Sequence, residues 1–562
     1  MKGMEPMKHV VMIVGNDITV DTRVKKIALS VAKAGLQVTV IGLSTSEKRE
    51  RSQMGPVQII RVPVPLTYRD WTRKSGGRRS LKDPASVKGR LKIVSTKKKL
   101  RQRELAASLG RLPQGSSGSP VVRVRREAIR WANRFVGKAY GLRERMLRRR
   151  FNKMAVQVDK KRRFSVPSLS RTQWRSKFPE LHDYELAFGP VIDELLPDVI
   201  HAHDVHMIGI AERAVARARV TRKNVPGRDI KWIYDAHEYV PGLARYTRDV
   251  VKGYSKLEDE YINNADAIIT VSEPLADLLV KDHGLSTRPA VVLNIPIETI
   301  GPDRGVSVRT AAGVEDDVPL IVYSGGIDPA RGVQTLVSAL EHLPEVHVAI
   351  VASPRNMGSA YVLSLIQQAR DRGYEDRVHV VPFVAPDAVV EYLRSAQLGV
   401  HPLSTGVMNH QIALPNKLFE YLHAGLPIVI SDNRAMAEFV NQTKVGEVFA
   451  DEDPVKLASA IRLVLEDHAK YIQAIVTSNV LNDYNWDRQV EVLVDLYRDI
   501  LPDTEIGTEP IVVGDLSEGE RFTESGILVV ADAPSTLVSV HGTLLDKPGR
   551  GRVPWNENGQ TT

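Results

Sequence analysis

The sequence predicts an α/β protein made of two Rossmann-like domains. Short apolar runs of strand length alternate with amphipathic stretches of helix length, and this alternation occurs twice. A segment rich in Pro and Gly, between residues 296 and 318, separates the two halves. A chain of 562 residues, 43% of them hydrophobic, is long enough for two domains with cores of their own.

The first half opens with a βαβ unit. His9 to Gly15 and Gln37 to Leu43 predict strands, and Thr22 to Ala34 between them has helical spacing. Further strands are expected within 198–203, 230–237, 267–272 and 290–295. The N-terminal Rossmann-like domain is therefore assigned to residues 1–68 and 178–296, with residues 69–177 as an insertion.

The second half repeats this organisation. Strands are expected within 320–325, 346–353, 378–384, 398–403 and 427–432. We assign residues 297–318 to a linker, 319–485 to the C-terminal Rossmann-like domain, 486–501 to a helix that crosses back, and 502–562 to a partly disordered tail. Within the tail, residues 526–533 and 535–542 have the composition of a small β element.

The segment from Pro415 to Asp432 combines a short helix with a carboxylate in apolar surroundings. Pro415 suits a helix start, where its missing N–H is not needed, and Gly425 suits the C-terminal end. Glu420 falls in the middle of this helix, where a carboxylate needs hydroxyls or a cation as partners. The hydroxyls of a ribose would serve Glu420, and Lys417 would offer its charge to a phosphate. An ordinary exposed Glu–Lys pair is the alternative.

A Gly-rich loop follows the strand expected at residues 320–324. Gly325 and Gly326 begin the loop, and Arg331 precedes the next helix. Such loops direct backbone N–H groups and a helix N-terminus at an anion, and a guanidinium adds bidentate geometry for phosphate oxygens. A plain strand-to-helix turn is the alternative. Two segments of this kind in one α/β pattern favour a shared site for a nucleotide sugar.

The sequence here resembles the GT4-type glycosyltransferases of the GT-B fold, over most of the chain outside a basic block and the tail. The motifs that carry the resemblance are VDTRVKKIALSVAKAGLQVTVIG (20–42), PDVIHAHD (197–204), YDAHE (234–238), ADAIITVSEPLADLL (265–279), NIP (294–296), GGIDPARG (325–332) and PNKLFEYLHAGLPIV (415–429). Their order matters more than any single motif. The resemblance implies a central cleft between an N-terminal acceptor domain and a C-terminal nucleotide-sugar domain.

The reaction that this resemblance implies is transfer of a sugar from a nucleoside diphosphate sugar to an acceptor hydroxyl, with retention at the anomeric carbon. Prearranged donors around the leaving diphosphate would be the largest catalytic contribution. The residues expected at the donor are Gly325, Gly326, Arg331, Asn409, His410, Asn416, Lys417 and Glu420. The catalytic positions expected at strand ends are His203, Asp204, His237 and Glu238, and an acceptor or cleft loop is expected to contain Gly15, Asn16, Asp17 and Arg23.

For each histidine, the alternative is a structural role as a hydrogen-bonded side chain. For Arg23, the alternative is a position on the helix surface. No catalytic base is assigned, since the resemblance allows the donor phosphate to accept the proton. Neither a metal nor a cofactor is expected, because Arg331 and Lys417 supply the positive charge. As substrate, a UDP-sugar is favoured over a GDP-sugar.

Two positions depart from the family pattern. Many relatives carry a first glutamate where this chain has Ile412, and an arginine near the Gly loop where it has Gly326. The run that includes Asn409 and His410 is expected to take over the sugar contacts of the missing glutamate. The departures bear on the identity of the sugar and on the affinity for the donor more than on the reaction class.

Positive charge is concentrated in the insertion. Residues 69–177 contain 34 Lys and Arg and 6 Asp and Glu, a local excess of +28 within a formal net charge of +10. We expect flexibility in part of 81–120 and an amphipathic helix over 123–156, with Trp131 and Phe135 on its apolar stripe. The helix would bind an anionic membrane through 81–156 or pack on the domain; specific nucleic-acid binding is not expected.

The rest of the composition excludes some kinds of site and indicates a cellular location. The chain has no cysteine, which excludes disulfides and thiolate metal sites. No long apolar run or signal pattern is evident, so a cytoplasmic location is expected, with peripheral attachment to the inner face of the plasma membrane. The acceptor is expected to be a glycan or a lipid-linked molecule in cell-envelope polysaccharide or glycolipid synthesis. A non-catalytic scaffold or regulator of this fold, or a nucleotide-sugar epimerase, is the alternative.

Overall fold

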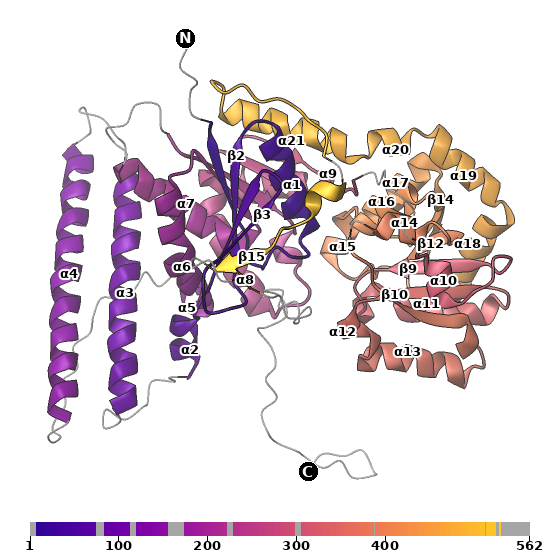
Figure 1. Ribbon diagram of the computed structural model, residues 1–562, viewed down its shortest axis with the longest axis horizontal. Coiled ribbons are helices and arrows are strands. Elements are labelled where there is room, and N and C mark those ends of the chain that lie inside the picture. The colour runs from indigo at the N-terminus through magenta and orange to yellow at the C-terminus, as the bar shows by residue number, and fades with distance from the viewer. Residues whose placement is uncertain are drawn as a thin grey trace.

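Two α/β domains lie side by side in the structure, a computed structural model (Figure 1). It describes residues 7–74, 84–112, 120–154, 173–221, 229–297, 305–386, 388–511, 513–523 and 528–529. Each domain has its own sheet with apolar clusters on both faces. The predicted fold class is confirmed.

The N-terminal domain is built on a sheet with the strand order β16-β15-β3-β4-β2-β1-β5-β6-β7-β8. The strands are β1 (His9–Ile13), β2 (Gln37–Leu43), β3 (Glu50–Met54), β4 (Val57–Val62), β5 (Val199–His203), β6 (Lys231–Ala236), β7 (Ala267–Thr270), β8 (Ala290–Val291), β15 (Arg521–Thr523) and β16 (Leu528–Val529). Along this order, β4, β2, β1, β5, β6, β7 and β8 are each paired in parallel with their neighbours in the series. Strand β3 pairs antiparallel with β4. The β3–β4 hairpin was not predicted, because ERSQM has no apolar alternation.

Helices cover both faces of this sheet. They are α1 (Thr22–Lys33), α2 (Thr67–Lys74), α3 (Pro84–Gly110), α4 (Pro120–Met154), α5 (Gln173–Lys177), α6 (Glu180–Leu195), α7 (Val205–Thr221), α8 (Arg248–Tyr261), α9 (Glu273–His283) and α21 (Trp486–Ile500), with the short 3₁₀ turns η1 (Val240–Gly242) and η2 (Ile262–Asn264). Among the described residues, no helix is both long and apolar enough to span a bilayer.

The C-terminal domain has a parallel sheet with the order β11-β10-β9-β12-β13-β14. The strands are β9 (Leu320–Ser324), β10 (His347–Ala352), β11 (Val378–Pro382), β12 (Leu398–His401), β13 (Ile428–Ser431) and β14 (Gly446–Phe449). The helices are α10 (Val308–Ala312), α11 (Val333–Ala339), α12 (Pro354–Met357), α13 (Ala360–Asp371), α14 (Val389–Leu393), α15 (Met408–Ile412), α16 (Asn416–His423), α17 (Arg434–Thr443), α18 (Pro454–Glu466), α19 (His468–Thr477) and α20 (Val480–Asp483), with η3 (Pro329–Arg331), η4 (Leu340–His342) and η5 (Glu375–Arg377). Because Val308 lies in the core of this domain, the domain begins within the predicted linker.

Each sheet has one point where the strand order reverses, between β1 and β5 in the first and between β9 and β12 in the second. Ligands of doubly wound sheets bind outside the carboxyl ends of the strands at this point. The loops after β1 and β5, and those after β9 and β12, are therefore the expected walls of a site.

The chain returns to the N-terminal domain after the second sheet. The predicted crossing helix is α21, whose Trp486 and Leu493 are buried in one cluster with Ile27 of α1. The segment after it, predicted as a partly disordered tail, continues along the domain, and β15 pairs antiparallel with β3. In the predicted β element, residues 528–529 pair with β15 instead, and 535–542 lie outside the described residues.

The basic insertion forms two long helices, α3 and α4, at the side of the N-terminal domain away from the C-terminal domain (Figure 1). The predicted helix over 123–156 corresponds to α4. Within 81–120, where flexibility was expected in part, residues 84–110 form α3 and pack against α7. Contact is so close that a Cβ on Gly110 would lie 1.6 Å from the carbonyl oxygen of Ala216.

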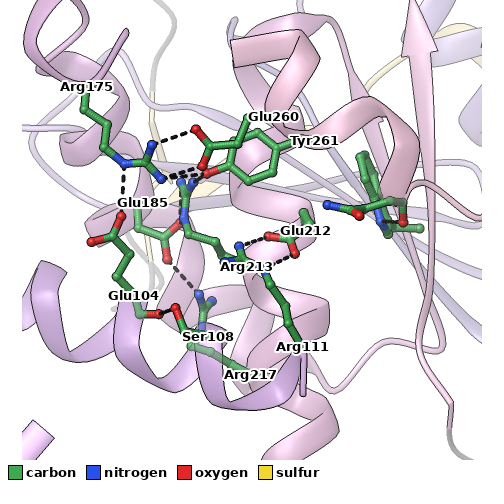
Figure 2. A network of polar contacts seen from close by, with 12 residues as sticks. Glu104, Ser108, Arg111, Arg175, Glu185, Glu212, Arg213, Arg217, Glu260 and Tyr261 are labelled. Carbon is green, nitrogen blue, oxygen red and sulfur yellow. Dashed lines mark hydrogen bonds and ion pairs between the residues drawn. The ribbon is translucent and has the colours of Figure 1, made fainter. Parts of the chain in front are cut away.

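Buried ion pairs attach α3 to the domain, as Figure 2 shows. Arg111, the residue after α3, donates from Nε to Glu212 of α7 at 2.6 Å, and Glu104 of α3 accepts from Nε of Arg175 at 3.0 Å. Deeper in the domain, Glu185 accepts from Nη1 of Arg217 at 2.8 Å, and Arg213 and Arg103 also donate to it. Arg103, Arg111 and Arg175 of the insertion thus pair with carboxylates of the domain.

Candidate active site

The space between the two domains contains most of the predicted site residues. One cavity, of about 370 Å³, lies at the ends of β1 and β5 and is lined by Gly15, Asn16, Arg23, His203, Asp204, His237 and Asn416. A second, of about 230 Å³, is lined by His237, Glu238, Arg331, Asn409 and His410. A third, of about 40 Å³, contains Asn416 and Glu420. Because His237 lines the first two cavities and Asn416 the first and third, the three cavities are neighbours between the domains.

On the N-terminal wall, a buried carboxylate connects three predicted residues. Arg23 donates from Nε and Nη2 to the two oxygens of Asp235, at 2.9 and 2.7 Å, and from Nη1 to the carbonyl of Val292 at 2.7 Å. Nδ1 of His203 lies 3.1 Å and Nε2 of His237 lies 3.2 Å from Oδ2 of Asp235. Arg23, predicted for the cleft, is 4% exposed and mainly holds Asp235.

This arrangement determines the charge states. Burial alone would raise the pKa of the Asp235 carboxyl, but Arg23 and His237 hold that pKa well below its ordinary value. Burial also opposes charge on His237, yet the adjacent Asp235 prevails and raises the pKa of His237. For His203, burial is dominant and lowers the pKa, so this ring is neutral at pH 7. His237 is therefore the histidine best suited to carry positive charge at the junction of the two larger cavities.

The other predicted catalytic residues differ in exposure. His203 borders the first cavity, but its side chain is fully buried and is therefore less accessible to a ligand than His237. Asp204 has φ of +69°, and its Oδ1 accepts the Val205 N–H at 2.6 Å at the start of α7. Glu238 is exposed on the wall of the second cavity.

In the loop after β1, side chains bond to the loop itself. Asn16 donates to Asp21 at 2.7 Å and accepts the Ile18 N–H at 2.8 Å. The side chain of Asp17 accepts the Thr19 N–H at 3.2 Å. Asn16 and Asp17 therefore shape the loop, while Gly15 and Asn16 line the cavity.

On the C-terminal wall, α16 lies against the Gly-rich loop. Pro415 is the N-cap of α16, and Gly425 beyond its end has φ of +77°, as predicted. Glu420 is 8% exposed and accepts from Nζ of Lys417 at 2.7 Å. The cation that this carboxylate needs is therefore Lys417, the residue predicted for the phosphate.

The Gly-rich loop contacts α16 through backbone and side chains. The Ser324 N–H donates to the Tyr421 hydroxyl at 2.7 Å, and a Cβ on Gly325 would lie 3.9 Å from Cγ of Lys417. The conformationally critical glycine is Gly332, with φ of +69°, where a Cβ would lie 1.7 Å from the Pro402 carbonyl oxygen.

Asn409 and His410, which were also predicted to bind the donor, line the second cavity. His410 bonds through Nδ1 to the Ser404 carbonyl at 2.8 Å, and burial lowers the pKa of this histidine. Asn409 exchanges two hydrogen bonds with the backbone of Tyr239 in the other domain. A donor contact by Asn409 would therefore require this link between the domains to open.

Several residues at the site were not identified from the sequence. His201 stacks on His203 with ring centroids 4.4 Å apart, and His401 lies at the end of β12 with its ring nitrogens buried. Lys26 lies in the third cavity with Glu420, and its Nζ donates to Asn294 at 2.8 Å. Burial lowers the pKa of Lys26 to about 7. The sequence feature that could have identified His201 and His401 is their position at or near the end of a predicted strand.

A metal ion has one candidate position among the described residues, at His201, His203 and Asp235, whose ligand atoms lie within 4.8 Å of one another. Arg23, however, occupies both oxygens of Asp235. A cation there would lie beside a guanidinium, so the donor set favours the ion pair over a metal.

Comparison with known proteins extends these observations. A family model described as Glycosyltransferase Family 4 matches residues 125–299, and one described as Glycosyl transferases group 1 matches residues 308–477. D-inositol 3-phosphate glycosyltransferase from Mycolicibacterium gilvum is 25% identical over 250 residues, which cover 42% of this chain and 57% of the relative. The enzyme of the same name from Xylanimonas cellulosilytica is 24% identical over 43% of this chain and 58% of its own length. The chain thus spans under two thirds of these relatives.

Solved structures show the same fold. Sucrose-phosphate synthase from Thermosynechococcus elongatus superposes with a TM-score of 0.56 at 14% identity, covering 88% of this chain and 100% of the other. A glycosyltransferase from Rickettsia africae gives a TM-score of 0.50 at 10% identity, covering 89% and 100%. At these identities the likeness concerns the GT-B fold alone.

Proposed function

We infer that this chain, which belongs to glycosyltransferase family 4, transfers a sugar from a nucleoside diphosphate sugar to an acceptor hydroxyl. The observation that carries this inference is the position of His237, which lines both larger cavities between the domains. Opposite it, Arg331 lines the second cavity, and Lys417 and Glu420 form an ion pair on α16 beside the Gly-rich loop. The names of the relatives support a hydroxylated acceptor.

In the proposed reaction, the C-terminal domain holds the donor. The ribose hydroxyls bind Glu420, and the diphosphate binds Lys417 and Arg331, whose fixed charges stabilise the negative charge that develops on the leaving group. Lys417 then exchanges part of its contact with Glu420 for phosphate oxygens. The side chains alone supply the neutralising charge, and a UDP-sugar is the first donor to test.

On the acceptor side, His237 is the proposed contact to the transferred sugar or the acceptor, oriented by Asp235 and Arg23. Transfer is proposed to occur with retention, and the acceptor to belong to cell-envelope polysaccharide or glycolipid synthesis. Retention is checked by NMR of the anomeric proton in the first minutes of product formation.

A thermal-shift panel with uridine, guanosine and adenosine diphosphates and their sugars tests the donor site. One nucleotide is expected to raise the melting temperature of the wild type, by an amount that grows with ligand concentration, and Glu420→Ala is expected to abolish the shift. If no nucleotide shifts the melting temperature, the protein is better explained as a non-catalytic scaffold. Release of free nucleotide without an acceptor would favour an epimerase.

We further propose that α4 binds an anionic membrane surface. Its outward side chains include Trp131, 67% exposed and stacked on Phe135 at 5.4 Å, while Val136 and Tyr140 of the same helix are buried against α3. Basic residues surround this apolar face, at Arg123, Arg125, Arg130, Arg134, Lys138 and Arg145. Aromatic side chains flanked by basic ones suit the headgroup region, which supports a peripheral location at a membrane.

Co-sedimentation with vesicles tests the membrane proposal. The wild type is expected to bind vesicles containing phosphatidylserine more strongly than neutral ones, and Trp131→Glu with Phe135→Glu to abolish the difference. Leu463→Glu, at an exposed leucine of the other domain, is the matched control. Equal binding to both vesicle types, or unchanged binding of the double variant, would refute the proposal.

A further inference from the structure

Asp328, in the Gly-rich loop, binds arginines from both domains. Nη2 of Arg245 donates to its Oδ2 at 3.0 Å, and Nε of Arg331 lies 3.8 Å from the same oxygen. Arg245 belongs to the N-terminal domain, in the loop between η1 and α8, and Arg331 ends η3 in the C-terminal domain. One carboxylate thus bridges two guanidinium groups across the cleft.

Both arginines line the 230 Å³ cavity, together with His410 and the carboxylate of Glu238. The Nε atom of Arg331 is buried and has no hydrogen-bond partner among the described residues. Arg245 is exposed over 61% of its side chain, and its ion pair with Asp328 is therefore weak. The Nε–H group of Arg331 is therefore a hydrogen-bond donor without an acceptor. The guanidinium of Arg245 can readily exchange Asp328 for another anion.

We propose that Arg245 and Arg331 form a clamp, with one arginine from each domain, that binds a phosphoryl group in the cleft. Asp328 lies between the two guanidiniums before the ligand arrives. Its other oxygen, Oδ1, accepts the Ala330 N–H at 3.0 Å, so the carboxylate is anchored to the loop. A phosphoryl group offers several oxygens to two guanidiniums and replaces the single oxygen of Asp328.

Arg245 approaches the Gly-rich loop from the opposite domain. Because the two arginines belong to different domains, the bound phosphoryl group links the domains and favours the closed cleft.

The phosphoryl group has two possible sources, the diphosphate of the donor and a phosphate ester on the acceptor. The proposal rests on the proposed function, since either source is a substrate of that reaction. Inorganic pyrophosphate tests the clamp without a nucleoside, and uridine, which lacks phosphate, tests the nucleoside site without the clamp.

Isothermal titration of the full chain would measure affinity for pyrophosphate, uridine diphosphate, uridine and D-inositol 3-phosphate. Arg245→Ala is expected to weaken pyrophosphate binding about tenfold or more, because charge-assisted hydrogen bonds are lost, and to leave uridine binding unchanged. Beside the loss for pyrophosphate, a parallel loss for uridine diphosphate identifies the donor as the source, and a loss for D-inositol 3-phosphate without one for uridine diphosphate identifies the acceptor.

Two further variants separate the clamp from a structural ion pair. Asp328→Asn keeps an acceptor for the Ala330 N–H and removes the competing charge, so it should bind pyrophosphate at least as tightly as the wild type. Arg248→Ala, an exposed arginine outside the cavity, is the matched control and should behave as the wild type. The proposal is overturned if the wild type does not bind pyrophosphate, if Arg245→Ala binds it normally, or if Asp328→Asn weakens binding as much as Arg245→Ala. A wild type that binds pyrophosphate but no nucleotide would refute only the donor assignment.

Discussion

Asn409 of the C-terminal domain pairs with the backbone of Tyr239 in the N-terminal domain through both ends of its amide. Its Oδ1 accepts the Tyr239 N–H at 2.8 Å, and its Nδ2 donates to the Tyr239 carbonyl at 3.1 Å. Ile412, on the same short helix, packs into the core cluster of the N-terminal domain. Helix α15 therefore joins the two domains at the side of the cleft.

Replacing Asn409 is expected to loosen this junction. Asn409→Ala removes two hydrogen bonds, together worth about 2 kcal/mol, and should shift the population towards open domain arrangements. Small-angle X-ray scattering would record the change as a larger radius of gyration. Asn482→Ala, at an exposed asparagine of α20, is the control, and identical scattering by both variants would contradict the assignment.

Removing the charge of Asp235 is expected to destabilise the N-terminal domain. Asp235→Asn leaves Arg23 buried without its counter-charge, which should cost about 3–5 kcal/mol in the free energy of unfolding. Urea unfolding would measure the loss, and NMR would show the pKa of His237 falling towards its ordinary value. Asp249→Asn, at an exposed position, should change stability by less than about 0.5 kcal/mol. Equal urea midpoints for the two variants would disprove the role of Asp235.

Burial of His401 makes stability depend on pH. Burial, together with the charges of Arg331 and Lys417, lowers the pKa of His401 to about 3, whereas the unfolded chain has a histidine pKa of about 6.5. As the pH falls below the pKa of the unfolded chain, the unfolded state binds a proton at this histidine, whereas the folded state does not. The stability contributed by neutral His401 is therefore lost progressively from about pH 6.5 towards pH 3.

His401→Phe removes this proton uptake while keeping a ring beside Tyr323. Between pH 7 and pH 5 the wild type should lose about 2 kcal/mol more stability than the variant. Urea midpoints at the two pH values would measure the difference. His342→Phe, at an exposed position, is the control. Parallel pH profiles for the wild type and His401→Phe would show that His401 does not contribute.

The segment after α21 is expected to contribute substantially to stability. Arg61 is fully buried and donates from Nη1 and Nη2 to the two oxygens of Glu518, both at 2.6 Å. Glu518→Ala leaves that guanidinium without its partner and should cost about 3–5 kcal/mol. Differential scanning calorimetry would detect the loss as a lower melting temperature, with Glu520→Ala as the neighbouring exposed control. A melting temperature equal to that of the control would exclude a structural role for this pair.

The sequence predicted strands and helices where periodicity was clear, but not contacts between distant segments. The parallel strands of both domains, and α1, α16 and α21, follow from apolar spacing and from Pro and Gly at helix ends. The β3–β4 hairpin is too polar for such a pattern. Helix α3 forms ion pairs with α5 and α6, which no local pattern contains.

The same distinction applies to the site. Strand-end positions predicted His237 and Asn16 for the cleft, because parallel strands share one carboxyl edge, and both line the 370 Å³ cavity. The partner of a charged side chain was less predictable, as Arg23 with Asp235 and Lys417 with Glu420 illustrate. Arg245 lies in a loop without a motif, and its approach to Asp328 depends on how the two domains pack.

The return of the chain through α21 and β15 has a consequence for biosynthesis. The N-terminal domain needs Trp486 and Leu493 for its core, and β15 extends its sheet. On the ribosome, the first domain to emerge is therefore the last to be completed, and the C-terminal domain can fold while its neighbour still lacks a helix. During that interval, the apolar face of α1 that α21 later covers is open to chaperones.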